Sequence, residues 1–144
     1  MPPTCTAAGR WCDNHNGTVT DTTTGLIWLK DAGWGADTAF NRAIGLAGEV
    51  KNGNPASLTD GSQAGQWRVP TFDELNTLTY GTEPISCSSQ YLFTGVQWSY
   101  PYWTSTTASF DPATGLCLEV YSGYGVGYCP KNGYFPFWPV RNGQ

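Results

Sequence analysis

Few side chains in this 144-residue sequence could carry out covalent chemistry. The sole histidine, His15, lies in the turn-like stretch "CDNHNGT", where we expect it to face solvent without a catalytic partner. The sequence contains no Gly-x-Ser-x-Gly nucleophile motif and no phosphate-binding loop. Because an activated nucleophile needs a general base within hydrogen-bond reach, the sequence predicts a protein that is not an enzyme.

The cysteines indicate disulfides rather than a metal site. The chain has five of them and no CxxC pair, which argues against zinc. Cys117 and Cys129 flank a predicted hairpin, so they could face each other across it. Cys5 and Cys12 could close a small loop, or one of them could reach Cys87. Disulfides would imply an oxidising compartment, and five buried free thiols are the alternative.

One polar stretch could bind a hard cation. "DNHNGTVTD" supplies Asp13, Asn14, Asn16 and Asp21 within nine residues, and calcium prefers such oxygen ligands. The spacing does not match an EF-hand loop. The alternative is a turn whose Asp and Asn side chains bond to their own backbone. We therefore expect no cofactor, while calcium stays open as a ligand.

Composition restricts the partners of this chain. Only 12% of the residues are charged, against a usual quarter, and 18 glycines and 10 prolines indicate a loop-rich, β-rich extracellular domain. The formal net charge of −4 disfavours nucleic acid and anionic membranes. No apolar run is long enough to span a bilayer, so we expect no membrane insertion. With no signal peptide at its start, residues 1–144 are interpreted as a single domain excerpted from a longer extracellular protein.

Two helices are expected in the first half of the chain. The first would begin after Asp37 as N-cap and turn Phe40, Ala43, Ile44 and Ala47 to one face. The second would span residues 72–80, because Thr71 and Glu74 form a capping box and Phe72, Leu75 and Leu78 repeat at helical spacing.

Strands are expected on both sides of these helices. A hairpin joins residues 18–20 to 26–30, a strand covers 102–107, a second hairpin covers 115–129, and a last strand covers 134–144. Pro136 and Pro139 restrict the last strand to a sheet edge or to alternating bonding. The total is an α+β plan with two short helices on a twisted, mainly antiparallel sheet with long loops.

The order of four motifs resembles a known family. "NGTVTDTTTGLIWLK", "WRVPTFDEL", "YWTSTT" and "WPVRNGQ" resemble the Lcl C-terminal domain family of bacterial collagen-like surface proteins. That family is similar to the C-type lectin-like fold of formylglycine-generating enzymes and of the variable proteins of diversity-generating retroelements. The resemblance implies that Trp67 is core and that Arg68 and Arg141 are structural. It also implies that Arg68 pairs with a carboxylate or with loop carbonyls.

A ligand surface is expected late in the chain, where aromatic residues exceed what a core of this size can hide. Because the resemblance places ligands over the late sheet and its loops, we expect binding at Tyr121, Tyr124, Tyr128, Lys131, Asn132 and Tyr134. Tyrosine and tryptophan offer large rigid contact area that suits glycan or protein recognition. Packing of these rings against a neighbouring domain or subunit is the alternative.

Three functions are consistent with these features of the sequence. The first is a non-catalytic adhesion module at the bacterial cell surface, with a glycan or protein ligand. The acidic charge balance favours a neutral glycan or a protein over the sulfated polysaccharides that related adhesins bind. The second is a structural assembly module of a fibre, trimer or filament, in which copies form a homo-oligomer. The third is a retroelement-diversified binding protein, with residues 118–137 as the variable segment.

Overall fold

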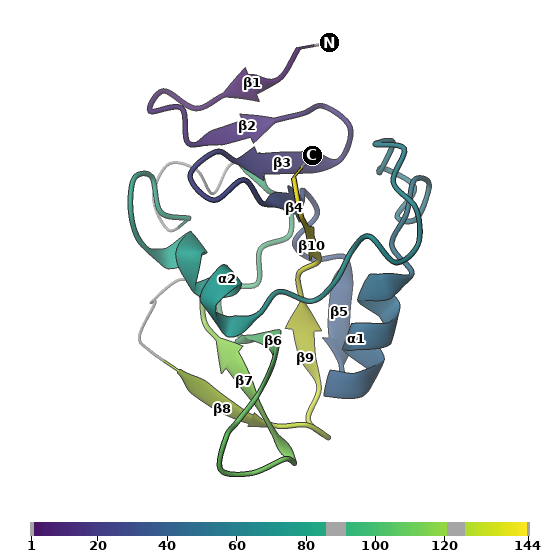
Figure 1. The fold of residues 1–144 in the computed structure, drawn as a ribbon, viewed down its shortest axis with the longest axis vertical. Coiled ribbons are helices and arrows are strands. Elements are labelled where there is room, and N and C mark those ends of the chain that lie inside the picture. The colour runs from purple at the N-terminus through teal and green to yellow at the C-terminus, as the bar shows by residue number, and fades with distance from the viewer. Residues whose placement is uncertain (1, 86–91, 121–125, 144) are drawn as a thin grey trace.

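A computed structural model describes residues 2–85, 92–120 and 126–143 of the chain, which form an α+β structure (Figure 1). As expected, the sheets are mainly antiparallel and two short α-helices accompany them. The strands are β1 Thr4–Cys5, β2 Trp11–Asp13, β3 Thr18–Asp21, β4 Ile27–Leu29, β5 Gly35–Thr38, β6 Tyr102–Thr107, β7 Thr114–Leu118, β8 Gly127–Pro130, β9 Phe135–Phe137 and β10 Val140–Arg141.

A five-stranded sheet occupies the end of the molecule where both termini lie (Figure 1). Its strand order is β1-β2-β3-β4-β10, so the last strand of the chain returns to pair with β4. The predicted first hairpin is confirmed, because Val19 on β3 faces Trp28 on β4. A disulfide joins Cys5 to Cys12 between β1 and β2.

A three-stranded sheet, β6-β7-β8, forms the opposite end of the molecule. The predicted strand at 102–107 is confirmed as β6, and β7 pairs with β8 as the arms of the predicted second hairpin. Cys117 and Cys129 are joined by a disulfide between these arms, as predicted, and of the two alternatives for Cys5 and Cys12 the structure has the small loop. Cys87 lies outside the described residues.

The prediction of one continuous last strand was wrong. Residues 134–144 contain two short strands in different sheets: β9 pairs with β5, and β10 pairs with β4. Pro139 lies between them, where its missing N–H interrupts any ladder. The fully buried Trp138 fixes this crossing, because its indole Nε1 donates to the carbonyl of Leu29 at 2.8 Å.

Helix α2 follows the sequence prediction closely. It spans Phe72–Asn76 and continues as the 3-10 turn η1, Thr77–Thr79. The Thr71 hydroxyl accepts from the Glu74 N–H, and the Glu74 carboxylate accepts from the Thr71 N–H. The predicted capping box is therefore confirmed, and the tighter η1 ends the helix within one residue of the expected position.

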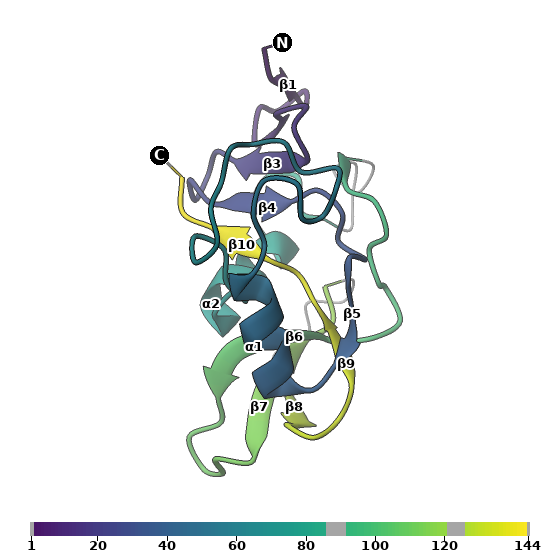
Figure 2. The ribbon, with the colours of Figure 1, turned by 90° about the vertical axis from the view of Figure 1, so that its right-hand side faces the viewer.

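Helix α1, Phe40–Gly48, begins later than predicted. Asp37 is not its cap: this exposed residue belongs to β5, and Ala39 occupies the N-cap position without a side-chain hydrogen bond. Pairing of β5 with β9, almost a hundred residues away, overrides the local helix signal. Ile44 is also not part of the buried face, since its side chain is 42% exposed. Figure 2 shows α1 lying against β5, β6 and β9.

The core is built largely from indole rings. Five tryptophans are buried, namely Trp11, Trp28, Trp67, Trp103 and Trp138. Several pack edge to face with other rings, as Trp28 does with Trp138 at a centroid distance of 5.5 Å. Much of the aromatic excess in the sequence is thus inside the molecule, and the remaining exposed rings define the candidate binding surface.

Candidate functional site

Two exposed aromatic rings meet on the outer face of the three-stranded sheet. Tyr128 on β8 is 59% exposed and Phe110, in the loop between β6 and β7, is 69% exposed. Their ring centroids are 5.2 Å apart in an edge-to-face arrangement. Tyr128 faces away from the side where the neighbouring Cys129 packs with α1, because successive residues of a strand alternate in direction. This pair therefore presents apolar area to solvent on the three-stranded sheet, which forms the end of the molecule far from the termini (Figure 1).

The turn after β8 holds three more of the expected ligand residues. Tyr134 is 71% exposed, and Asn132 is also exposed. Lys131 is more restrained: its Nζ donates to the Thr107 hydroxyl at 2.9 Å and lies 4.4 Å from the centre of the Phe40 ring. Tyr121 and Tyr124, the remaining two residues of the predicted site, lie outside the described residues. Of the four that can be placed, Tyr128, Asn132 and Tyr134 face solvent.

Phe110 is the aromatic residue that the sequence prediction missed. It stands in "SFDPATG", where Asp111 and Pro112 signal a turn between two strands. The Asp111 side chain organises this turn by accepting from the Ala113 N–H and from the Thr114 hydroxyl, and both bonds lower the pKa of its carboxyl. Because loops run over the protein surface, a ring directly before such a turn is a candidate for exposure, and that signal could have identified Phe110.

The two arginines near Trp67 are both engaged with carboxylates. Trp67 is buried and its Nε1 donates to the Ser62 hydroxyl. Arg68 forms an ion pair with Glu74 of the capping box. Arg141 forms one with the nearly buried Asp60 at 3.1 Å and lies over the Trp67 ring. These contacts tie β10 to the loop before α2.

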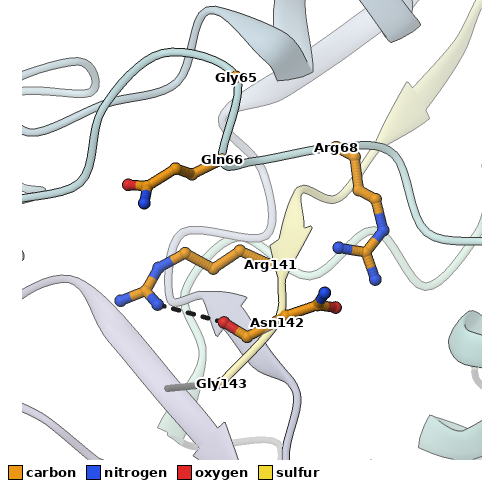
Figure 3. A pocket seen from close by; sticks show the side chains of 6 residues that line it. All are labelled: Gly65, Gln66, Arg68, Arg141, Asn142 and Gly143. Atoms are coloured by element: carbon orange, nitrogen blue, oxygen red, sulfur yellow. Dashed lines mark hydrogen bonds between the residues drawn. The ribbon is translucent and has the colours of Figure 1, made fainter.

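A cavity of about 350 Å³ opens between these two arginines (Figure 3). It is lined by Gly65, Gln66, Arg68, Arg141, Asn142 and Gly143. Arg141 and Gln66 extend to one side of β10, whereas the Asn142 side chain extends toward Arg68 on the other side (Figure 3). The lining is mostly polar, so the cavity suits a hydrophilic group rather than an apolar one.

The four oxygen-bearing residues considered for calcium have separate protein partners. Asp13 binds Lys30 at 2.7 Å and accepts from the His15 N–H, while Asp21 is buried against Arg10. The two amides are bonded locally: Asn14 donates to Thr18 and Thr20, and Asn16 accepts from the N–H and hydroxyl of Thr18. Within residues 2–85, 92–120 and 126–143, no three His, Cys, Asp or Glu side chains group as a metal site.

The Asp13 carboxyl responds to this environment. Partial burial alone would raise its pKa, but the hydrogen bonds from Lys30 and from the His15 backbone outweigh burial and hold the pKa below its ordinary value. His15 itself is exposed in a left-handed turn at φ 60°, and its Nε2 lies 2.8 Å from the Thr4 hydroxyl. The polar side chains of this stretch thus stabilise a turn.

Comparison with known proteins gives one positive finding. The model of the family described as the Lcl C-terminal domain matches residues 17–141, a range that overlaps all four sequence motifs of the chain. A search of curated proteins finds no match. Among the described helices, none has the length and apolar character needed to cross a membrane.

Proposed function

This chain belongs to the Lcl C-terminal domain family, a family of surface-associated domains, and on that premise we propose that it is a non-catalytic extracellular binding module. Its ligand is a neutral glycan or a protein, held by the exposed aromatic surface that we define as Phe110, Tyr128 and Tyr134. The two disulfides fit an oxidising, extracellular location.

One observation carries this proposal: large rings stay exposed in a chain that buries five tryptophans. Phe110, Tyr128 and Tyr134 are each at least 59% exposed. Leaving such rings in water forgoes roughly 1.5–3 kcal/mol per side chain that burial would contribute. Exposed apolar area of this kind is typical of contact surfaces. The acidic composition, with seven Lys and Arg against eleven Asp and Glu, favours uncharged ligands here.

Alanine substitutions test the surface directly. We expect Tyr128→Ala and Tyr134→Ala to weaken binding to immobilised neutral glycans or purified surface proteins by roughly tenfold or more, as truncation of an aromatic contact does. Since both rings are exposed, the melting temperature should not change. Binding is measured by surface plasmon resonance and stability by differential scanning calorimetry.

Tyr80→Ala is the matched control. Tyr80 is 57% exposed, and it lies after η1, where its backbone carbonyl accepts a hydrogen bond from Arg10. It should bind as the unmodified protein does. Wild-type affinity in both test variants would refute the assignment of the ligand to this surface.

A structural assembly module is the second candidate function. The same exposed rings favour it, because a surface that contacts a ligand can equally contact another copy of the chain. In a binding module Tyr128 is accessible in solution, whereas in an assembly module another copy of the chain covers it. The mass of the protein in solution therefore distinguishes the two functions.

A further inference from the structure

Arg68 has more hydrogen-bonding capacity than its ion pair uses. A guanidinium carries five N–H donors. Within the described part of the chain, the Arg68 side chain makes one hydrogen bond, from Nη2 to Glu74. Its side chain is 37% exposed and lines the cavity of Figure 3. The remaining donors are therefore available to a group that enters this cavity.

The position of Arg68 is fixed by its backbone and by its carboxylate partner. The Arg68 N–H donates to the Val140 carbonyl and the Val140 N–H donates to the Arg68 carbonyl, each at 2.9 Å. Glu74 is held in turn by the capping box, where its second carboxylate oxygen accepts from the Thr71 N–H. The arginine is thus pre-organised, which lowers the entropic cost of binding.

Asn142 adds a second polar group beside Arg68. It is exposed, directly follows β10, and its side-chain amide extends toward Arg68 (Figure 3). Within the described residues this side-chain amide makes no hydrogen bond. The bond between Arg141 and Asn142 is accepted by the Asn142 backbone carbonyl instead. An amide N–H next to a guanidinium fork matches the two oxygens of a carboxylate.

The charges around the cavity also favour an anionic group. Two of the four arginines of this acidic chain line it, and its lining contains no acidic side chain. Asp60, the partner of Arg141, has a side chain that is only 1% exposed and lies behind the arginine. Glu74, the partner of Arg68, is 22% exposed and lies outside the lining. The charged groups that line the cavity itself are therefore the two guanidinium groups.

We propose that the cavity between Arg68 and Arg141 binds the carboxylate of a small acidic ligand, with the Arg68 guanidinium and the Asn142 amide as donors. The carboxylate belongs either to an acidic sugar or to an amino-acid chain end. This site goes beyond the proposed function: it lies at the end of β10 in the five-stranded sheet, whereas the aromatic surface lies on and beside the three-stranded sheet.

The test follows the Arg68 Nε–H resonance by NMR while ligands are added at constant ionic strength. The probes are sodium glucuronate, N-acetylglycine, neutral glucose and sodium chloride. We expect a saturable shift with one or both acids and none with glucose or chloride. Equal affinity for both acids assigns recognition to the carboxylate alone, and tighter binding of one identifies the source of the carboxylate.

Asn142→Asp provides the decisive variant. The new carboxylate lies beside Arg68, and the change removes no side-chain hydrogen bond of Asn142. It therefore competes with the carboxylate of the ligand for the Arg68 guanidinium. We expect affinity to fall roughly tenfold or more, because like charges at a contact are strongly unfavourable. Asn41→Asp is the control, because it makes the same change at an exposed residue near the start of α1. The cavity residue Gly65 contacts the other end of this helix, where its N–H donates to the Gly48 carbonyl.

Two results would overturn the proposal. One is the absence of a saturable shift at Arg68 with either acid, or an equal shift with glucose or chloride. The other is wild-type affinity in Asn142→Asp. Tyr128→Ala should bind both acids normally, so failure of this site and failure of the aromatic surface are distinguishable.

Discussion

At the scale of single residues, Arg10 connects parts of the chain that are far apart in sequence. Its Nε and Nη2 donate to the two oxygens of Asp21, each at 3.0 Å. Its other bonds reach backbone carbonyls of the segment after α2, namely those of Thr77, Tyr80 and Thr82. Both charged groups are buried, with side chains 3% and 0% exposed. A buried charge is tolerated only when it is paired and hydrogen-bonded in this way.

Removing Arg10 should therefore be severely destabilising. Arg10→Gln leaves the Asp21 carboxylate buried without its cation, and breaking a buried pair costs about 3–5 kcal/mol. The free energy of unfolding, measured by urea denaturation, should fall by that amount. Arg42→Gln, an exposed change on α1, should stay within about 0.5 kcal/mol of the wild type. Similar unfolding midpoints for the two variants would contradict the role assigned to Arg10.

At the scale of elements, the start of α2 depends on one hydroxyl. α2 is only five residues long, so it gains little from its own propensity and relies on capping and packing. Thr71→Ala removes the acceptor of the Glu74 N–H, and loss of an N-cap costs about 1 kcal/mol. Chemical denaturation should show that loss. Thr59→Ala changes an exposed threonine whose recorded hydrogen bond comes from its backbone N–H, so it should cost clearly less. Equal losses would argue against the cap.

Elements defined by neighbouring residues could be predicted from the sequence. The capping box of α2 and the hairpin of β3 and β4 depend on contacts within about a dozen residues, and both were predicted. Asp37 was misassigned because its strand pairs with β9, and no local signal indicates that pairing. The last strand was likewise predicted whole, although β9 and β10 join different sheets.

The candidate sites also divide into features set by nearby residues and features set by pairing of distant segments. Tyr128 and Tyr134 could be selected because the aromatic excess late in the chain is visible in the sequence and the family resemblance places ligands there. The cavity beside Arg68 could not, because it forms only when β10 returns to the segment before α2. The partners of Arg10 are also distant in sequence, up to 72 residues away for the Thr82 carbonyl. Sequence patterns record which residues are suited to a role, while the sheet order decides which of them meet.

At the scale of the whole molecule, a different sheet forms each of the two ends. Both termini lie beside the five-stranded sheet, and the three-stranded sheet lies at the opposite end (Figure 1). The exposed pair of Phe110 and Tyr128 belongs to this second sheet, away from the termini.

The mass of the protein in solution tests whether the aromatic surface contacts ligands or other copies. For a binding module, light scattering should give the mass of one chain over a wide range of protein concentrations. An exposed pair such as Phe110 and Tyr128 is small beside the roughly 800 Å² per partner that a standard stable interface buries, so this pair alone should not hold a dimer together. A mass that rises with concentration in the wild type but not in Tyr128→Ala would instead identify the aromatic surface as an assembly contact. Because Tyr128 is exposed, the variant should fold normally, and loss of association could then be attributed to the ring itself.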